Sequence, residues 1–186
     1  MHTKTLILVY GFAASGKTST GIEIAKRLKL PLLTKDSIQE LIYDGLGTGD
    51  ADYQKAAAKT SYRLADYFLR QLMLTGSSVV FEGNLSCQYD TPRFLKLQED
   101  FGYAVVQVRC GADAEVLEAR LIERAQSADR HAGHNDLEKL PQLREQFAKR
   151  VPENLNESWV LIEHDTTDFS KVDFEMLAQK VQEAGA

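Results

Sequence analysis

The run Gly11–Thr18 holds the residues with the most specific chemistry in this chain. It reads Gly-Phe-Ala-Ala-Ser-Gly-Lys-Thr, which fits the G-x-x-x-x-G-K-[ST] pattern of a phosphate-binding loop. Gly11 and Gly16 allow backbone conformations and a close approach that a Cβ would obstruct. The N–H groups of the loop and of the following helix then face an anion, Lys17 can reach the outer phosphates, and the Thr18 hydroxyl can ligate magnesium. We therefore expect the chain to bind a nucleoside triphosphate or a closely similar molecule.

The residues on either side of this loop predict the elements that it needs. Thr5–Tyr10 is apolar and β-prone, as a buried strand should be, and Ser19–Leu28 has apolar residues at helical spacing. The alternative is an ordinary glycine-containing turn with a helix cap. The strand before the loop and the helix after it favour the phosphate-binding interpretation.

Asp36 directly follows a short predicted strand, residues 31–34. A carboxylate at that position could face the phosphate loop and accept a proton from an attacking hydroxyl group. It could also cap the helix that begins near Ser37, because Asp is a favoured N-cap residue. The two roles can coexist.

Glu82 follows the apolar strand 79–81 and should lie near Thr18 if this strand neighbours the first one. It could hold magnesium through water, orient the substrate or assist the base. The alternative is a buried carboxylate that is satisfied by backbone amides.

Arg120, Arg124 and Arg130 form a third group. The first two are four residues apart on a predicted helix and so share a face, and Arg130 lies in the polar segment 126–141. Guanidinium groups suit the oxygens of a transferring phosphoryl group, and a mobile arginine-bearing lid could close over the nucleotide. The alternative is a solvated charged face.

His131 and His134 raise the possibility of a metal site with Asp129 or Asp136. The cluster contains no cysteine and no regular element to fix its geometry, whereas zinc sites normally have better-defined ligand sets. We therefore interpret this segment as a polar closing loop.

The order of elements along the chain alternates between strands and helices. This alternation predicts a parallel sheet with helices on both faces, and in such folds the ligand sits at the carboxyl ends of the strands. The expected strands span residues 5–10, 31–34, 79–81, 103–108 and 159–162. The expected helices span 19–28, 51–74, 113–125, 143–151 and 172–183, with others starting near 38 and at Thr91-Pro92.

Length and composition place limits on the class of protein. The 186 residues suit one domain, 1–186, that includes the lid, and the net charge of −5 argues against a large nucleic-acid-binding surface. The two cysteines give neither a metal spacing nor a disulfide framework, so we expect a reduced, cytoplasmic setting. The longest apolar run near the N-terminus is too short to span a bilayer, so no membrane partner is expected. A monomer or a homodimer is consistent with the sequence.

The chain resembles the P-loop kinases that phosphorylate small molecules, nucleotides or polynucleotide ends, an AAA-type ATP-binding group. The resemblance covers Thr5 to about Asp168. It depends on the motifs Gly11–Thr18, Lys35-Asp36-Ser37, Phe81–Leu85, Arg120-xxx-Arg124 and Arg130–His134. It implies a three-layer α/β/α fold with a five-stranded parallel sheet and a small lid, with ATP and Mg2+ as cofactors.

The resemblance also assigns roles to residues. The residues expected to be catalytic are Lys17, Asp36 as the base, Arg124 and Arg130. Those expected to bind nucleotide are Gly11, Ala13, Ala14, Ser15, Gly16, Lys17, Thr18, Ser19, Arg120 and Thr166, the last beside the adenine. Thr18 and Glu82 are the expected metal ligands.

Gln39 departs from the pattern of polynucleotide kinases and related enzymes, which often have an arginine three residues after the catalytic aspartate. The missing cation favours an uncharged acceptor, although Lys35 keeps one positive charge nearby. We expect an ATP-dependent phosphotransferase that acts on a hydroxyl of a small molecule, with residues 38–74 forming the acceptor pocket. The alternatives are a polynucleotide 5′-hydroxyl kinase and a non-kinase ATP-binding regulatory ATPase.

Overall fold

The computed structural model describes residues 4–128 and 130–186. Within these residues five strands form one parallel sheet in the order β2-β3-β1-β4-β5. The strands are β1 (Thr5–Gly11), β2 (Leu32–Thr34), β3 (Val79–Gly83), β4 (Ala104–Gly111) and β5 (Val160–Asp165). The five-stranded parallel sheet that was predicted from the sequence is confirmed.

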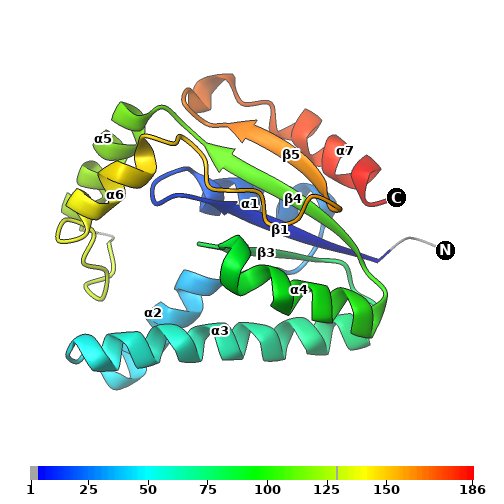
Figure 1. Cartoon of the computed structure of the whole chain (residues 1–186), viewed down its shortest axis with the longest axis horizontal. Coiled ribbons are helices and arrows are strands. Elements are labelled where there is room, and N and C mark those ends of the chain that lie inside the picture. Colours follow the sequence, from blue (N-terminus) through cyan, green and yellow to red (C-terminus); the bar gives the residue numbers. More distant parts are fainter. Residues whose placement is uncertain (1–3, 129) are drawn as a thin grey trace.

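The helices cover both faces of the sheet and one of its ends. They are α1 (Lys17–Leu28), α2 (Lys35–Leu46), α3 (Ala51–Leu74), α4 (Cys87–Phe101), α5 (Ala114–Gln126), α6 (Leu140–Phe147) and α7 (Phe174–Ala184), with a short 3₁₀ helix, η1 (Phe169–Lys171). Figure 1 shows α5 and α6 beyond the carboxyl ends of the strands, where a ligand is expected in such folds. Each helix in the described ranges is too short or too polar to cross a bilayer.

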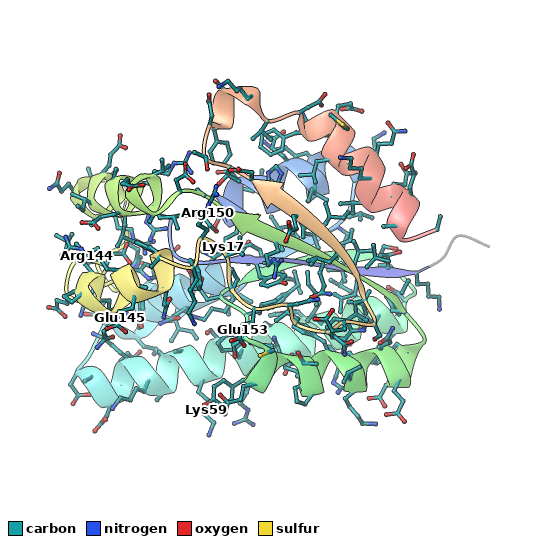
Figure 2. The ribbon with its side chains drawn as sticks, turned by 45° about the horizontal axis from the view of Figure 1, so that its top comes forward. Lys17, Lys59, Arg144, Glu145, Arg150 and Glu153 are labelled. Atoms are coloured by element: carbon teal, nitrogen blue, oxygen red, sulfur yellow. The ribbon has the colours of Figure 1, made fainter. Side chains whose placement is uncertain are left out.

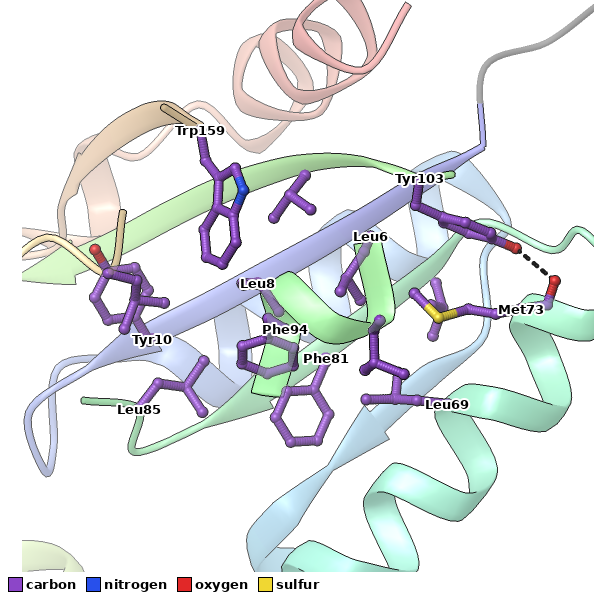
Figure 3. Packing of buried hydrophobic residues seen from close by; sticks show 14 of the residues in the cluster. Leu6, Leu8, Tyr10, Leu69, Met73, Phe81, Leu85, Phe94, Tyr103 and Trp159 are labelled. Carbon is purple, nitrogen blue, oxygen red and sulfur yellow. Dashed lines mark hydrogen bonds between the residues drawn. The ribbon is translucent and has the colours of Figure 1, made fainter. Parts of the chain in front are cut away.

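The central strand β1 is buried on both faces, and its side chains alternate between two cores. Leu6 and Leu8 pack in a cluster with residues of α3 and α4, such as Leu69 and Phe94 (Figure 3). Ile7 and Val9 point to the opposite face and belong to a second cluster, with residues of α1 and α7. The sheet is therefore the middle layer of an α/β/α sandwich.

A third, smaller core joins α5 and α6 to the loop after β1. Leu117 and Leu121 of α5 and Phe147 of α6 are buried in it, and Phe12 of the loop packs against them. Because the two helices that flank the lid rest on the phosphate-loop motif, the base of the lid is fixed relative to that loop.

The bounds of several helices differ from those predicted from the sequence, and α4 and α6 differ most. α4 begins at Cys87 and not at Thr91-Pro92, because the Asp90 carboxylate accepts a hydrogen bond of 2.8 Å from the N–H of Ser86, the N-cap residue, and so stabilises an earlier start. α6 spans Leu140–Phe147 and not 143–151.

The ends of α5 and α6 define the extent of the lid. A helix that continued to residue 151 could not contain Arg150, because this residue has a φ of 62°, in the left-handed region. α5 continues through Gln126, and α6 already includes Pro141. The segment between the two helices is therefore residues 127–139.

Candidate functional site

The phosphate-loop motif has the strand–loop–helix geometry that its sequence predicts. β1 ends at Gly11 and α1 begins at Lys17. Gly16 has a φ of 73°, and a Cβ there would lie 2.4 Å from a ring carbon of Phe169. Both its backbone conformation and its surroundings therefore require glycine. The first N–H groups of α1 are left to face a ligand.

Lys17 is buried, with 4% of its surface exposed, and Nζ lies 3.4 Å from the carbonyl oxygen of Phe12. Figure 2 shows it near the carboxyl ends of the strands, on the side of α5 and α6. A buried ammonium group next to a loop of N–H groups makes this end of the sheet strongly attractive to an anion.

A cavity of about 560 Å³ lies in front of the loop, and we call it the loop cavity. It brings together side chains that lie far apart in the sequence. Its lining includes Ala14, Gly16, Lys17, Thr18, Ser19, Asp36, Arg120, Arg124, Arg130 and Phe169. Most of the residues that were predicted to bind nucleotide or to act in catalysis therefore share one cavity.

A second cavity of about 420 Å³ lies among α2, α3 and the lid, and we call it the lid cavity. It shares Lys17, Asp36, Arg124 and Arg130 with the loop cavity. These four side chains therefore form the junction between two pockets. Of the sequence region 38–74 that was expected to form an acceptor pocket, the residues that line the lid cavity are Gln39, Tyr43, Ala51, Gln54, Lys55 and Ala58.

Asp36 lies in the first turn of α2, which follows β2 without a connecting turn. The N-cap residue is Thr34, so the prediction that Asp36 caps the helix is wrong. Burial on its own would raise the pKa of Asp36, but the ammonium groups of Lys35 and Lys17 outweigh burial and lower it below its ordinary value. Lys35 Nζ lies 3.2 Å from Asp36 Oδ1. The carboxyl group is therefore ionised at neutral pH and can accept a proton.

Glu82 ends up beside the phosphate loop because β3 pairs with β1, where Glu82 lies opposite Val9. It is 1% exposed, and neither carboxyl oxygen has a regular hydrogen-bond partner among the described residues. Burial raises its pKa to about 7, although the Lys17 ammonium and the Thr18 hydroxyl oppose that rise. The backbone-satisfied alternative is therefore wrong. A buried carboxyl group without a regular hydrogen bond, close to the Thr18 hydroxyl, fits a Mg2+ ion at this position.

Arg124 and Arg130 converge on one carboxylate, that of Asp136. Arg130 donates two hydrogen bonds to it, from Nε at 2.8 Å and from Nη2 at 2.9 Å, and Arg124 donates a third from Nη2 at 3.0 Å. The side chain of Arg130 is 14% exposed and that of Asp136 is 11% exposed. The two arginines therefore form a partly buried cluster at the cavity junction and do not form a solvated face.

Arg120 holds the loop that follows β5. Its Nη2 donates to the carbonyl oxygens of Thr166 at 2.7 Å and Thr167 at 3.2 Å, and its guanidinium lies 4.9 Å from the ring centroid of Phe169. Thr166 is completely buried and donates from Oγ1 to the carbonyl of Ser15 at 2.9 Å. Thr166 does not line either cavity, and it ties the last strand to the phosphate loop.

The two lid histidines contact carboxylates of α2. His134 Nε2 lies 2.7 Å from Glu40 Oε1, and His131 Nε2 lies 3.1 Å from Asp44 Oδ1. Asp129, named above as a metal ligand candidate, lies outside the described residues, and residues 4–128 and 130–186 contain no group of three or more side chains suited to hold a metal ion. The histidines fasten the lid to α2.

Sequence reasoning missed three residues of the site. Phe169 packs against Gly16 in the loop cavity, and Lys55 and Lys139 line the lid cavity. No motif identifies them, because a phenylalanine or a lysine in a polar stretch is common on protein surfaces. They become part of the site only because α3, the lid and the loop after β5 meet at one end of the sheet.

The fold and the loop together define a class: the protein has a P-loop kinase-like three-layer α/β/α fold. Residues 6–149 match the family of AAA domains, so the chain belongs to that family. The comparison with curated proteins gives no match.

Solved structures resemble the chain over nearly its whole length. A candidate kinase from Chloroflexus aurantiacus J-10-fl is 28% identical, with a TM-score of 0.91 and 99% of each chain covered. A sugar kinase from Janibacter sp. HTCC2649 is 17% identical, with a TM-score of 0.59, and 97% of this chain and 93% of that one are covered. APS kinase from Mycobacterium tuberculosis is 17% identical, with a TM-score of 0.55 and coverage of 98% and 97%. The last two similarities concern the fold alone.

Proposed function

We propose that this protein is an ATP-dependent phosphotransferase that moves the γ-phosphoryl group to a hydroxyl of a small-molecule acceptor. The observation that carries the proposal is the junction of the two cavities. The loop cavity suits the triphosphate, the lid cavity has the size of a small-molecule pocket, and Asp36 lines both. The candidate kinase with the similar fold supports the same class of reaction.

In the proposed reaction the acceptor hydroxyl attacks the γ-phosphorus. A new oxygen–phosphorus bond forms, the bond from the γ-phosphorus to the bridging oxygen of ADP breaks, and the hydroxyl proton passes to Asp36. The lowered pKa of Asp36 keeps this carboxylate ionised at neutral pH, so it can accept a hydrogen bond from the hydroxyl and take its proton as the oxygen–phosphorus bond forms. Holding both reactants at one junction converts their encounter into a reaction within a complex.

The cations at the junction would balance the charge of the transferring group. Lys17 would contact the outer phosphates, and Arg124 and Arg130 would replace their contact with Asp136 by contacts to phosphate oxygens. Thr18 and Glu82 would hold Mg2+, which neutralises charge on the phosphate oxygens when it is bound.

The test is a screen of metabolite pools with the purified protein, ATP and Mg2+, with mass spectrometry to detect a newly phosphorylated product. ADP formation should depend on the acceptor. Asp36→Asn should lower the turnover by about 100-fold or more while nucleotide binding is kept, because the variant loses the base but keeps the phosphate loop.

Asp100→Asn is a matched control, because Asp100 is a surface carboxylate of α4 with ion pairs to Arg70 and Lys96. It should turn over acceptor like the wild type. Unchanged turnover in Asp36→Asn would exclude Asp36 as the base. ATP hydrolysis at the same rate with and without acceptors would indicate a regulatory ATPase.

A further inference from the structure

The walls of the lid cavity are strongly basic. Among the described residues, six cationic side chains and two carboxylates line it, which leaves an excess of four positive charges. The cations are Lys17, Lys35, Lys55, Lys139, Arg124 and Arg130, and the carboxylates are Asp36 and Asp136. The chain as a whole has a net charge of −5, so this excess is a local feature of the pocket.

The nucleotide accounts for only part of this charge. Lys17, Arg124 and Arg130 also line the loop cavity and can serve its phosphates, whereas Lys35, Lys55 and Lys139 line only the lid cavity. Lys35 is paired with Asp36 at 3.2 Å, which leaves Lys55 and Lys139. Both of these lysines are exposed and so lie toward solvent. Two cations at the acceptor side therefore remain after the nucleotide has been placed.

Few protein carboxylates are available to these two lysines. Lys55 has an ion pair of 3.3 Å with Asp52, but the two side chains are 78% and 92% exposed, so the pair is weak. Lys139 has no ion pair with a described residue. An anionic group of a ligand would therefore meet two cations that are not neutralised by a buried partner.

The other walls of the cavity suit hydroxyl groups. Gln54 presents an amide that can donate and accept hydrogen bonds, and the Tyr43 hydroxyl, which accepts from the Gln39 amide, can donate its own proton. The Gln39 carbonyl oxygen accepts from Lys35 and so holds that cation at the cavity wall. Gln39 lacks the charge of an arginine at that position, but α3 and the lid bring other cations into the same cavity.

We propose that the acceptor is a polyhydroxylated small molecule that bears an anionic group, a carboxylate or a phosphate, which Lys55 and Lys139 recognise. The inference rests on the proposed phosphotransferase function. It replaces the expectation of an uncharged acceptor that Gln39 suggested. A polynucleotide end fits less well, because the cavity has a volume of about 420 Å³ and His131 and His134 fasten the lid to α2 across it.

The experiment uses two matched series of probes: glycerol, glycerate and glycerol 3-phosphate, and sorbitol, gluconate and sorbitol 6-phosphate. Binding is measured by thermal shift with saturating AMPPNP and Mg2+, which keeps anions out of the phosphate loop. Transfer is measured separately as product formation with ATP. In at least one series an anionic member should bind about tenfold more tightly than the neutral member, the size expected for two partly exposed charge contacts. Comparing the carboxylate member with the phosphate member of each series shows which anionic group is preferred.

The variants connect this preference to the two lysines. Lys55→Gln with Lys139→Gln should lose the tenfold preference. Lys59→Gln should keep it, because Lys59 lies one turn further along the same face of α3 (Figure 2) and does not line the lid cavity. The inference is overturned if neither series shows a preference for the anion, if the double variant keeps the preference, or if a 5′-hydroxyl oligonucleotide is the molecule whose phosphorylation depends on these lysines.

The outcome for the proposed function can be separated from this result. Anion binding that depends on the two lysines, without transfer to any acceptor, would contradict the phosphotransferase function and leave the anion pocket standing. Transfer to neutral and anionic members at equal rates would support the function and overturn the anion preference.

Discussion

Asp136 and Arg130 form a two-point contact in the lid, with Arg130 Nε and Nη2 lying 2.8 and 2.9 Å from the two carboxylate oxygens. A carboxylate and a phosphate bind the guanidinium fork in the same way. In the absence of nucleotide, Asp136 therefore takes the place on Arg130 that a phosphoryl group would take. The charge of Arg130 is already held at the cavity junction before a ligand arrives.

This contact predicts that Asp136→Asn binds nucleotide more tightly than the wild type, by about threefold to tenfold, because an anion that competes for Arg130 is removed. The dissociation constant of ATPγS, measured by calorimetry, checks this. Asp52→Asn removes the same charge from an exposed site on α3 and should leave the constant unchanged. Equal or weaker binding by Asp136→Asn would show that the carboxylate does not compete with the nucleotide.

Lys17 should be the cation on which turnover depends most. Lys17→Met is expected to lower kcat/KM by about 100-fold or more, because a positioned charge at the transferring phosphate is lost. Steady-state kinetics, with circular dichroism to verify folding, measure the effect. Lys26→Met on the same helix, where the side chain is 71% exposed, is the control and should behave like the wild type.

Glu82 should make the stability of the nucleotide-free protein depend on pH. Between pH 4.5 and about 7 the unfolded chain releases the Glu82 proton while the folded protein keeps it, so stability falls as the pH rises through this window and is level above it. The Glu82→Gln variant has no carboxyl group to titrate at this position, so its stability lacks this pH dependence. Relative to the wild type, its unfolding free energy should rise by about 3 kcal/mol between pH 4.5 and 8.

Urea denaturation at a series of pH values, without nucleotide or Mg2+, measures this difference. Glu99→Gln, at a side chain that is 79% exposed on α4, is the control variant. Parallel pH profiles for the wild type and Glu82→Gln would mean that the buried carboxyl group has an ordinary pKa. The same Glu82→Gln variant should lose Mg2+-dependent turnover.

Arg120 should act through the loop after β5. A lysine cannot donate to the carbonyls of both Thr166 and Thr167 and also lie flat against Phe169, so Arg120→Lys should loosen this loop. We expect faster hydrogen exchange at residues 166–169 and nucleotide binding that is weaker by about fivefold. Arg144→Lys, whose side chain is 58% exposed and pairs with Glu118, is the control (Figure 2). Unchanged exchange at this loop in Arg120→Lys would exclude the holding role.

The sequence predicted the fold well because the signals that define it are local. The buried strand before Gly11, the loop itself and the helix after it lie within one continuous stretch of chain, Thr5–Leu28. The alternation of the remaining strands and helices was also sufficient to predict one parallel sheet. Boundaries were less accurate where a tertiary or side-chain contact decides them, as at the start of α4, where Asp90 binds the N–H of Ser86.

The candidate site was predictable in part for the same reason. Lys17 belongs to a motif, Asp36 follows β2 and Glu82 lies near the carboxyl end of β3, so a parallel sheet must bring them to one end. The lid could not be predicted in this way. Nothing in the sequence indicates that Asp136 accepts hydrogen bonds from Arg124 and Arg130, because many carboxylates are within reach of an unfolded arginine.

The sequence by itself determined that this chain has a phosphate loop on a parallel sheet, since consecutive residues and the period of the apolar positions carry that information. Only the tertiary structure decided that a second, basic cavity opens at Asp36. Lys55 and Lys139 are far apart along the chain and take part in that cavity because α3 and the lid fold toward the same end of the sheet. The interaction of a charged side chain with a ligand depends on its distance from the other charges of the site. That distance is set by the packing of elements far apart in the sequence, and no local sequence pattern determines it.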